Sequence, residues 1–436
     1  MVYSFQRYED YKKVDDLAFD ELPAGWTLKK VKHLFNIGRG RVISQEELDD
    51  NGVFPVYSSQ TQNNGCLGFI NTYDFDCKQI TWTTDGANAG TVFLREGKHN
   101  CTNVCGTLQP INKNLNFSFY LYSLQYITQF HKRPDTNGAK IMNGEMAAIS
   151  LCIPSDNEQQ KIANFLDYET AKIDTLINKQ EELIKLLKEK RQAVISHAVT
   201  KGLNPDAPMK DSGVEWLGEV PEHWDVTKFS YAIDFLEGPG ILAADFHDEG
   251  VPLLRIQNVK EVFVTDNFKT YLDPLKVKEK WDHFRVEKGD LLISASASTG
   301  LISEVDERTV GAVPYTGLIR LKPMTQDITA GFIRYIVQSD LFYEQIKLLQ
   351  TGSTIQHFGP IHLQQMKVIL PPVDEQDKIV DQIQQSVKHI DSLIESAYRI
   401  IDLTKERKTA LISAAVTGKI DVRDWQEPTY QESAQR

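Results

Sequence analysis

The stretch from Pro154 to Thr200 constrains the fold of this chain more than any other. It opens Pro-Ser-Asp-Asn-Glu-Gln-Gln-Lys-Ile and then contains neither proline nor glycine until Gly202. Its residues repeat in alternating steps of four and three, the spacing of a coiled-coil seam. The apolar seam positions are Ile162, Leu166, Ile173, Leu176, Leu183, Leu187 and Val194, and the weak ones are Glu169, Gln180 and Lys190. A helix over residues 158–200 would be about 65 Å long at ~1.5 Å per residue, and such a helix needs a partner.

The chain carries a second copy of this stretch. The opening returns at residues 375–379, Glu-Gln-Asp-Lys-Ile, shortly after Pro371 and Pro372. One heptad run alone is more often an isolated coiled coil or a buried helix, whereas two copies with matching ends predict two long helices packed on each other. The seam recurs at Ile379, Ile383, Ile390, Leu393, Ile400 and Leu411, and the end Ser196, Ala198, Val199 and Thr200 is repeated as Ser413, Ala415, Val416 and Thr417.

The repeat also includes the sequence before each helix. Pro23-Ala24-Gly25-Trp26 is matched by Pro221-Glu222-His223-Trp224, so each half reads Pro-x-x-Trp, then a domain, then a long helix. This pattern predicts seven parts: an N-terminal segment packing near the distal helix (1–21), a first β domain (22–157), a central helix (158–201), a connector (202–219), a second β domain (220–374), a distal helix (375–417) and a C-terminal tail (418–436).

Short apolar runs broken by Gly- and Asn-rich turns indicate that both domains are mainly β. In the first domain we expect strands at residues 79–83 and 91–94 and one helix at 117–130. In the second we expect strands at 253–256 and 290–294 and a helix at 328–349. The predicted fold class is α+β, with two mainly β domains separated by two long antiparallel coiled-coil helices in a pseudo-two-fold internal repeat.

Composition narrows the class of protein. No run of ~18 apolar residues suggests a membrane span, and five cysteines, an odd number, favour a reduced cytoplasmic protein. The net charge is −12, with 12 basic and 11 acidic side chains (+1) in residues 22–157 but 15 and 21 (−6) in residues 220–374. Non-specific affinity for phosphate needs several uncompensated cations. If the chain binds DNA, a partner is therefore expected to supply part of the positive charge.

Motifs for catalysis are missing from the sequence. There is no Asn-Pro-Pro-aromatic or Asp-Pro-Pro-aromatic tetrad and no Gly-rich phosphate loop ending Gly-Lys-Ser/Thr. Pro134-Asp135 with Lys140 lacks the second acid of a nuclease metal site, and no cluster with Cys101 and Cys105 completes a zinc site. The sequence predicts a binding protein without a metal or cofactor of its own.

Two longer phrases point to a known family. Residues 210–224, Lys-Asp-Ser-Gly-Val-Glu-Trp-Leu-Gly-Glu-Val-Pro-Glu-His-Trp, resemble the connector into the second recognition domain of the specificity subunit of Type I restriction-modification enzymes. Residues 370–376, Leu-Pro-Pro-Val-Asp-Glu-Gln, are similar to the entry of that family's distal conserved helix. The resemblance covers nearly the whole chain, and residues 16–20 depart most from it.

The resemblance implies a non-catalytic subunit with two target-recognition domains, each reading one half of a split, asymmetric sequence in double-stranded DNA. It further implies two adenine methylase (modification) subunits, which bind S-adenosylmethionine, and restriction subunits that complete the nuclease. No membrane partner is implied.

Candidate DNA-reading residues are loop side chains with forked or short polar groups, because sequence is read by hydrogen bonds to base edges. For each one taken singly, a solvated loop or turn is the commoner role. In the first domain they are Arg39, Arg41, Ser58, Ser59, Gln60, Thr61, Gln62, Asn63 and Asn64, with Lys132, Arg133 and Lys140 as phosphate contacts. In the second they are Arg255, Gln257, Asn258, Ser294, Ser296, Ser298, Thr299, Ser353, Thr354 and Gln356.

Two other classes stay open at this point. One is a self-sufficient DNA adenine methyltransferase, and the other is a coiled-coil scaffold or two-headed regulator without methylase partners. Co-purification with a methylase subunit would distinguish them from the specificity subunit.

Overall fold

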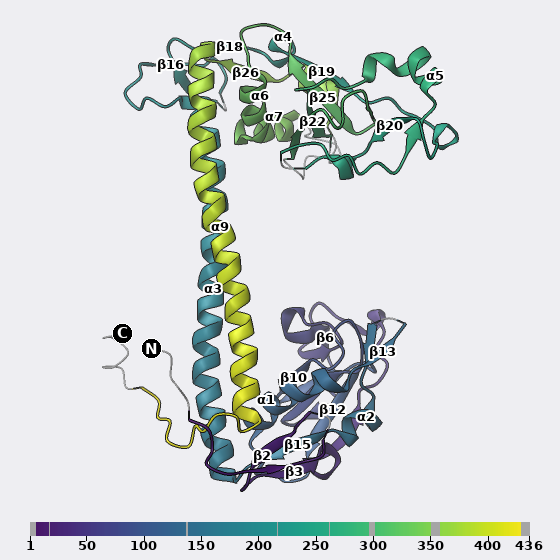
Figure 1. The fold of residues 1–436 in the computed structure, drawn as a ribbon, viewed down its shortest axis with the longest axis vertical. Helices are drawn as coiled ribbons and strands as arrows, with labels where there is room; N and C mark the ends of the chain where they lie inside the picture. The colour runs from purple at the N-terminus through teal and green to yellow at the C-terminus, as the bar shows by residue number, and fades with distance from the viewer. Residues whose placement is uncertain are drawn as a thin grey trace. The chain divides into compact units, whose positions relative to one another are not determined.

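The computed structural model describes residues 6–16, 18–136, 138–215, 217–260, 262–295, 301–349 and 358–428. The chain divides into two units, one built from residues 1–180 with 399–436 and the other from residues 181–398. Each unit holds one β domain, the first part of one long helix and the last part of the other (Figure 1).

Two long helices confirm the prediction of an antiparallel pair. Helix α3 spans Asp156–Lys201 and helix α9 spans Val373–Val416. Within the first unit Lys408 Nζ lies 2.6 Å from Asp174 Oδ1, and within the second Arg191 Nε lies 3.1 Å from Asp391 Oδ1. Residue numbers therefore rise along α3 while they fall along α9 (Figure 1).

The repeated Glu-Gln motif fastens each helix to the strand before it. Gln159 Nε2 donates to the carbonyl of Pro154 at 3.1 Å, and Gln376 Nε2 donates to the carbonyl of Pro371 at 2.8 Å. Both glutamines are buried, at 4% and 0% exposure. A buried amide needs such partners, so the motif specifies how the chain turns from strand into helix.

Both long helices also end in the same way, at a glycine. Gly202 (φ +77°) and Gly418 (φ +71°) follow α3 and α9 in the left-handed conformation that ends helices. A side chain at Gly202 would lie 3.1 Å from the ring of Trp224, and one at Gly418 would lie 2.5 Å from Pro23. Each Pro-x-x-Trp segment therefore packs against the end of the helix from the other half of the chain.

Part of the predicted seam is wrong. Leu176, Leu183, Leu393 and Ile400 are exposed, while the buried positions are Ile173, Ile184, Leu187, Ile390, Ala397 and Ile401. The seam takes two successive steps of four, from 169 through 173 to 177, before it resumes alternation. A strict 3.5-residue period drifts from the ~3.6-residue turn of a helix, and a stutter of this kind corrects the drift.

The first β domain has a four-stranded antiparallel sheet in the order β10-β8-β12-β4 and a second sheet in the order β6-β5-β11-β7, where β5 and β11 are parallel. A third, small sheet has the order β13-β14-β9. The strands are β3 (Thr27–Lys30), β4 (Phe35–Arg39), β5 (Phe54–Tyr57), β6 (Cys66–Ile70), β7 (Phe75–Asp76), β8 (Gln79–Thr83), β9 (Asp85–Gly86), β10 (Val92–Arg95), β11 (Lys98–Cys101), β12 (Cys105–Pro110), β13 (Arg133–Asp135), β14 (Gly138–Lys140) and β15 (Ser150–Ile153), and the helices are α1 (Phe117–Ile127) and α2 (Asn143–Ala148).

The second β domain repeats this topology. Its main sheet has the order β23-β22-β25-β19, and β20 pairs with β21 antiparallel and with β24 in parallel, as β5 does with β6 and β11. The elements are β18 (Asp225–Lys228), α4 (Phe229–Ala232), β19 (Ile233–Glu237), β20 (Val251–Leu254), β21 (Tyr271–Leu272), α5 (Pro274–Lys276), β22 (Leu291–Ser294), β23 (Ile302–Glu304), β24 (Val313–Pro314), β25 (Leu318–Pro323), α6 (Ala330–Gln338), α7 (Asp340–Leu349), α8 (Pro360–Leu363) and β26 (Lys367–Leu370).

Short strand pairs precede each domain. The first is β1 (Tyr11–Lys13) with β2 (Glu21–Pro23), and the second is β16 (Met209–Asp211) with β17 (Glu219–Pro221). Tyr11 donates its hydroxyl to the carbonyl of Gly418 at 2.8 Å, which brings the N-terminal segment to the end of α9.

No helix within the described ranges combines the length and apolar character needed to cross a membrane.

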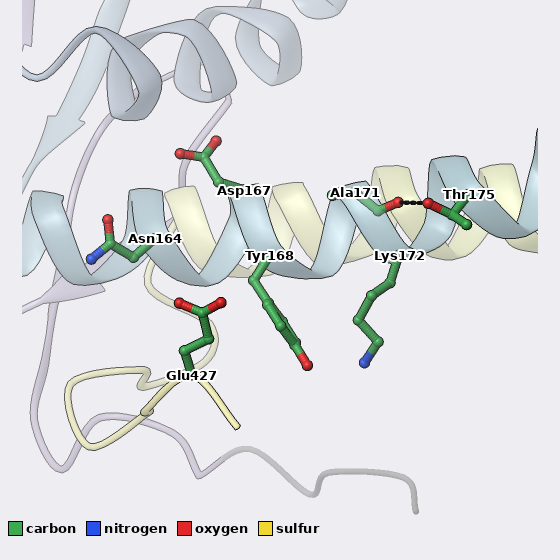
Figure 2. A pocket seen from close by; sticks show the side chains of 7 residues that line it. All are labelled: Asn164, Asp167, Tyr168, Ala171, Lys172, Thr175 and Glu427. Atoms are coloured by element: carbon green, nitrogen blue, oxygen red, sulfur yellow. Dashed lines mark hydrogen bonds between the residues drawn. The ribbon is translucent and has the colours of Figure 1, made fainter. Parts of the chain in front are cut away.

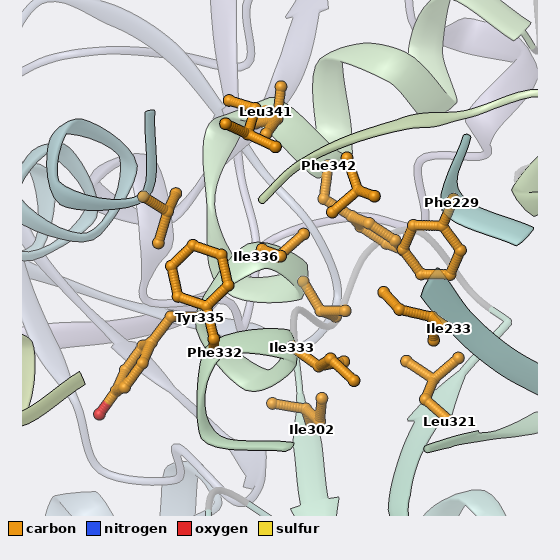
Figure 3. Close-up of a cluster of buried hydrophobic side chains, with 14 of the residues drawn as sticks. Phe229, Ile233, Ile302, Leu321, Phe332, Ile333, Tyr335, Ile336, Leu341 and Phe342 are labelled. Carbon is orange, nitrogen blue, oxygen red and sulfur yellow. The ribbon is translucent and has the colours of Figure 1, made fainter. Parts of the chain in front are cut away.

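Each domain has its own hydrophobic core, which includes residues of both long helices. In the second, Phe229, Phe332 and Phe342 pack with aliphatic side chains of the sheet (Figure 3). The two cores fill equivalent sheet positions differently. Trp82 lies over Gly106, where a side chain would meet the indole at 2.3 Å, whereas two isoleucines, Ile293 and Ile319, are paired at the matching register.

The strands predicted near residues 79–83, 91–94, 253–256 and 290–294 and the helix at 117–130 are confirmed within a few residues. The single helix predicted at 328–349 is wrong, because α6 and α7 are separated by Ser339. That residue is extended (φ −82°, ψ 157°), and its hydroxyl donates to the carbonyl of Ile336 at 2.6 Å. A serine that bonds local backbone in this way competes with continued helix.

Candidate nucleic-acid interface

Three separate stretches of the first β domain meet at one edge. The loop Ser58–Gly65 joins β5 to β6, the turn 85–90 follows β8, and the hairpin β13–β14 lies beside that turn (Figure 1). Asn88 Nδ2 donates to the carbonyl of Ser59 at 3.5 Å, and Ala139 pairs with Gly86 across β14 and β9. The loop and the hairpin are thus joined through the turn.

Arg39 and Arg41 reach the same edge through the β11–β12 turn. Arg41 forms a β-bridge with Thr102, whose hydroxyl donates to Ser58 Oγ at 3.1 Å, and Arg39 Nε donates to the carbonyl of Asn103. The candidates predicted in the first domain, which are up to a hundred residues apart in sequence, are therefore neighbours in space.

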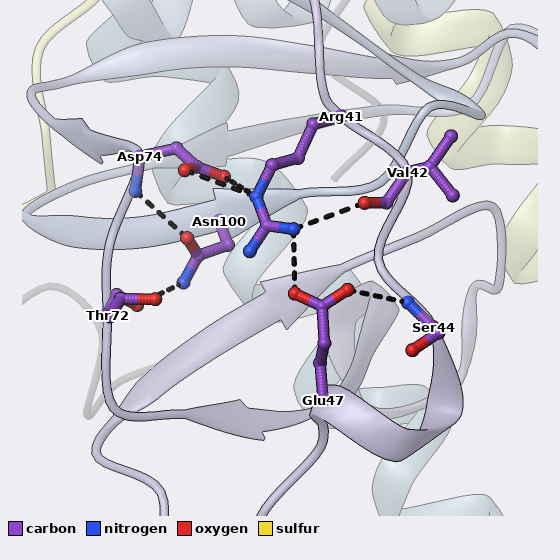
Figure 4. Close-up of polar contacts among 7 residues, drawn as sticks. All are labelled: Arg41, Val42, Ser44, Glu47, Thr72, Asp74 and Asn100. Carbon is purple, nitrogen blue, oxygen red and sulfur yellow. Dashed lines mark hydrogen bonds and ion pairs between the residues drawn. The ribbon is translucent and has the colours of Figure 1, made fainter.

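Arg41 is held by two carboxylates of its own domain (Figure 4). Its Nη1 lies 2.8 Å from Glu47 Oε2 and its Nε lies 3.1 Å from Asp74 Oδ2. The hydrogen bond to Glu47 raises the pKa of Arg41, and the same bond lowers the pKa of Glu47. Asn100, which is fully buried, fixes the backbone of this turn by accepting from Asp74 N at 2.9 Å and donating to Thr72 O at 2.8 Å. Arg41 is thus oriented before any ligand arrives.

The three candidate phosphate contacts flank the hairpin. Lys140 Nζ lies 2.8 Å from Asp135 Oδ2, a hydrogen bond that lowers the pKa of Asp135, and Arg133 is paired with Glu145. Lys132 is exposed and has no ion pair among the described residues. Two of the three cations are therefore neutralised within the domain, consistent with the small net charge of the sequence.

The loop Ser58–Gly65 turns tightly. Ser58 N donates to the carbonyl of Gly65 at 3.0 Å, and Gln60 Nε2 donates to the carbonyl of Cys66. Thr61, Gln62, Asn63 and Asn64 are exposed at its tip. The amide of Gln60 is used internally, which leaves the tip residues as the accessible polar groups of this loop.

In the second β domain, the loop after β20 carries three candidates with different surroundings. Arg255 is half-buried, with its guanidinium 4.9 Å from the ring centre of Phe246 and 5.4 Å from that of Tyr315. Gln257 is exposed. Asn258 is 2% exposed, accepts from Arg255 N at 3.0 Å and donates to the carbonyls of Thr265 and Asn267. Asn258 holds the loop in shape and presents no free amide, which corrects its assignment as a reader.

Of the remaining candidates in the second domain, one lies within the described residues. Ser294, at the end of β22, is 4% exposed. Ser296, Ser298, Thr299, Ser353, Thr354 and Gln356 lie outside the described residues. The residues that border those two stretches meet, because Phe358 N donates to the carbonyl of Ala295 at 2.9 Å.

A shared glycine shapes both edges. A Cβ at Gly40 would lie 2.1 Å from Cys101 O, and a Cβ at Gly238, the matching position, would lie 2.2 Å from Pro314 O. Only glycine allows the chain directly after β4 or β19 to approach the neighbouring backbone so closely. The chain therefore leaves the main sheet at the same place in both domains, and in the first domain Arg41 follows directly.

A pocket of about 570 Å³ lies along α3, where Tyr168 and Lys172 project beside Glu427 of the C-terminal stretch (Figure 2). It contains none of the candidate readers. No group of three His, Cys, Asp or Glu side chains within the described ranges is placed to hold a metal ion.

Some residues of the first edge escaped the sequence analysis. Asn88, Thr102 and Asn103 contact the candidates by hydrogen bonds. Asn88 lies in a Gly- and Asn-rich stretch that was interpreted only as a turn, and nothing in the sequence indicates that Thr102 lies beside Ser58. Arg95, which is buried beneath the loop, also lacked any signal in the sequence.

Two copies of one β domain, each with a polar loop edge and each followed by a long helix, define a protein with duplicated recognition modules. The family described as Type I restriction modification DNA specificity domain matches residues 23–186 and 247–398. The chain therefore belongs to the family of Type I restriction-modification specificity subunits, and its two β domains are the recognition domains.

Relatives over most of the chain agree with this assignment. The Type I restriction enzyme MjaVIII specificity subunit of Methanocaldococcus jannaschii is 24% identical over 97% of this chain and 99% of its own length. A putative type I specificity subunit of Mycoplasma pneumoniae is 30% identical over 80% of this chain and 86% of its own length. A solved structure described as concerning complex assembly and conformational transition of the type I R-M system has a TM-score of 0.68 at 14% identity, covering 92% of this chain and 99% of that one. This last likeness shows the fold alone.

Proposed function

We propose that this chain is the sequence-reading, non-catalytic subunit of a Type I restriction-modification complex. Each β domain reads one half of a bipartite, asymmetric site in double-stranded DNA. The chain also carries two adenine methylase subunits, which bind S-adenosylmethionine, and the restriction subunits join that assembly.

The observation that carries this proposal is that the chain contains one β-domain framework twice, with different loops at the edge of each copy. Both domains have the same sheet order and the same close-approach glycine, yet the loops at their edges differ in sequence and charge. A repeated module with two different reading edges suits a target whose halves differ. The division into segments at residues 22, 158, 202, 220 and 375 belongs to this proposal, since each β domain would then act as an exchangeable cassette.

The charge distribution supports a need for partners. The first domain carries +1 and the second −6, and the cations Arg41, Arg133 and Lys140 are already paired with carboxylates. Phosphate neutralisation accounts for most non-specific DNA affinity. The methylase subunits would therefore supply much of the positive charge that holds the DNA.

The proposal is tested by expressing the chain with and without its cognate methylase subunit and mapping methylated adenines across a genome. We expect one recurring bipartite sequence only when both proteins are present. The purified chain alone should incorporate no radiolabelled methyl group into DNA. Incorporation by the chain alone would instead support a self-sufficient methyltransferase, and a pair that leaves no recurring sequence would contradict the proposal.

A further inference from the structure

The loop Ser58–Gly65 contains the most unusual backbone of the described chain. Asn63 (φ 50°) and Asn64 (φ 54°) are the two positive-φ residues other than glycine within the described ranges, and Gly65 (φ 77°) follows them. Asparagine tolerates the left-handed region better than most residues, but usually as a single residue. Backbone of this kind persists only where the surroundings hold it, and it clusters at ligand-binding sites.

Arg95 is what holds it. The residue is 2% exposed, and its Nη1 donates to the carbonyl of Asn64 at 2.7 Å. Its guanidinium lies 3.6 Å from the ring centre of Tyr57 and 4.4 Å from that of Phe93, while Nε donates to Thr81 Oγ1 at 3.2 Å. The guanidinium is thus held by two aromatic rings and two hydrogen bonds, so the carbonyl that it binds is fixed too.

Two further features indicate that Arg95 serves the loop rather than general stability. Within the described ranges no carboxylate forms an ion pair with Arg95, and its Nη2 is buried without a hydrogen-bond partner. Burying a cation without a counter-ion costs stability. A side chain at position 65 would lie 2.8 Å from Nη2, so the glycine there is required by Arg95 as well as by its own φ.

We propose that Asn63 and Asn64 read adenine in A·T base pairs of the first half-site and that Arg95 is their positioning residue. Their side chains are exposed at the loop tip. A carboxamide matches the paired donor and acceptor that adenine presents in the major groove at N6 and N7. The inference rests on the proposed function, and it specifies which residues of the first β domain recognise which base.

The inference is confined to the first domain. Within its described residues, the second β domain has positive φ only at glycines, and its corresponding loop is organised by the buried amide of Asn258. Each molecule therefore contains an internal control, because the second half-site should be read normally when the first loop is altered.

The test uses the full chain with its methylase subunits, in cells and as a purified complex. N63G/N64G removes both amides and keeps the left-handed backbone available, while N63D/N64D keeps side-chain shape but removes the donor. N114G is the matched control, because Asn114 is exposed in the same domain beyond the far end of β12. Affinity is measured for duplexes in which each A·T pair of the first half-site is replaced by G·C.

We expect N63G/N64G to lose roughly 10- to 100-fold of discrimination at one or two adjacent A·T pairs, with the second half-site and N114G unchanged. R95K keeps a charge but loses the stacked fork, so it should relax discrimination at those same pairs. In the triple variant R95K/N63G/N64G, the R95K effect should vanish, as it must when Arg95 acts only through the two asparagines.

Unchanged discrimination in both N63G/N64G and N63D/N64D would overturn the inference while leaving the proposed function intact. Loss of discrimination at every position of both half-sites would overturn it also, because that result indicates a structural role. A wild-type complex that methylates no recurring sequence would overturn both the inference and the proposed function.

Discussion

The two β domains share a frame and differ at its edge. The register of β4 on β12 places Arg39 where the register of β19 on β25 places Glu237, so one position of the same sheet carries opposite charges. Gly40 and Gly238 bring the next residues equally close to the neighbouring strand. After those glycines the sequences of the two domains differ, with Arg41 in one domain and Pro239 in the other.

This comparison separates what specifies the fold from what specifies recognition. The two domains have the same sheet order, and the repeated side chains are buried, namely the tryptophan of the Pro-x-x-Trp motif and the glutamine at each helix start. The features that differ are exposed loop residues and the groups directly beneath them. Arg95 supports the first loop from a neighbouring strand, whereas the loop of the second domain is held by its own Asn258. We therefore expect that recognition can change without any change in the framework that the two domains share.

Exchange of a whole domain should give the largest effect. Residues 27–150 replaced by the corresponding domain of another family member should change the first half of the methylated sequence completely and leave the second half as it was. The reason is that the frame elements at both borders, β3 and β15, pair with each other and close the domain. Genome-wide mapping of methylated adenines measures the result. A change in both halves would show that the domains read DNA jointly.

Alanine at the shared glycines should give the next largest effect. In Gly40→Ala and Gly238→Ala the new Cβ would lie 2.1 and 2.2 Å from a backbone oxygen, so the edge must move at a cost of about 1–3 kcal/mol. Gly25→Ala and Gly240→Ala are the controls, since nothing lies within 4 Å of a Cβ there. Hydrogen exchange resolved by domain should show each harmful substitution in its own domain only. Equal effects in both domains would contradict the view that each frame is independent.

A smaller effect is expected when one carboxylate is removed beside Arg41. Glu47→Gln leaves Arg41 paired with Asp74 alone, so Arg41 should bind phosphate more readily and steepen the slope of log affinity against log salt by up to ~0.9, the contribution of one contact. Glu96→Gln makes the same change of charge in the same domain, but the carboxylate that it removes pairs with Lys78 at 3.2 Å and not with Arg41. Equal slopes for the two variants would mean that Arg41 does not face DNA.

The sequence predicted the framework shared by the two domains well, but it could not separate exposed from buried polar loop residues, for a physical reason. Duplication made the long helices, the Pro-x-x-Trp segments and the domain order visible as repeats. Short apolar runs between turn residues predicted strands such as β8. The exposed residues had no such pattern. Asn258 and Gln257 look equivalent in sequence, yet one amide is fully bonded to backbone and the other is exposed. The seam error at Leu176 has a different origin, because strict alternation of four and three was assumed and the stutter from 169 through 173 to 177 breaks it.

The smallest effect should come from pH, and its sign should differ between the domains. Burial raises the pKa of Asp290 in the second domain above its ordinary value of 3.8, and the hydrogen bond from Lys140 lowers the pKa of Asp135 in the first. The protonated form of Asp290 is favoured in the fold. Its contribution is complete below the unfolded pKa and is lost as the pH rises through the folded one. The contribution of Asp135 is present above its unfolded pKa and is lost as the pH falls through its lowered folded pKa.

Acidification should therefore first stabilise the second domain, just above pH 3.8, and then destabilise the first, just below it. Both changes should be small, because Asp135 is screened by solvent and the hydrogen bond that Asp290 accepts from Glu287 N at 2.8 Å lowers the pKa of Asp290 against the effect of burial. Hydrogen exchange by domain, corrected for the intrinsic effect of pH, measures them. Asp290→Asn should abolish only the upper change and Asp135→Asn only the lower one. A common response of both domains to acid would show that other groups dominate and that this difference between the domains has no consequence for stability.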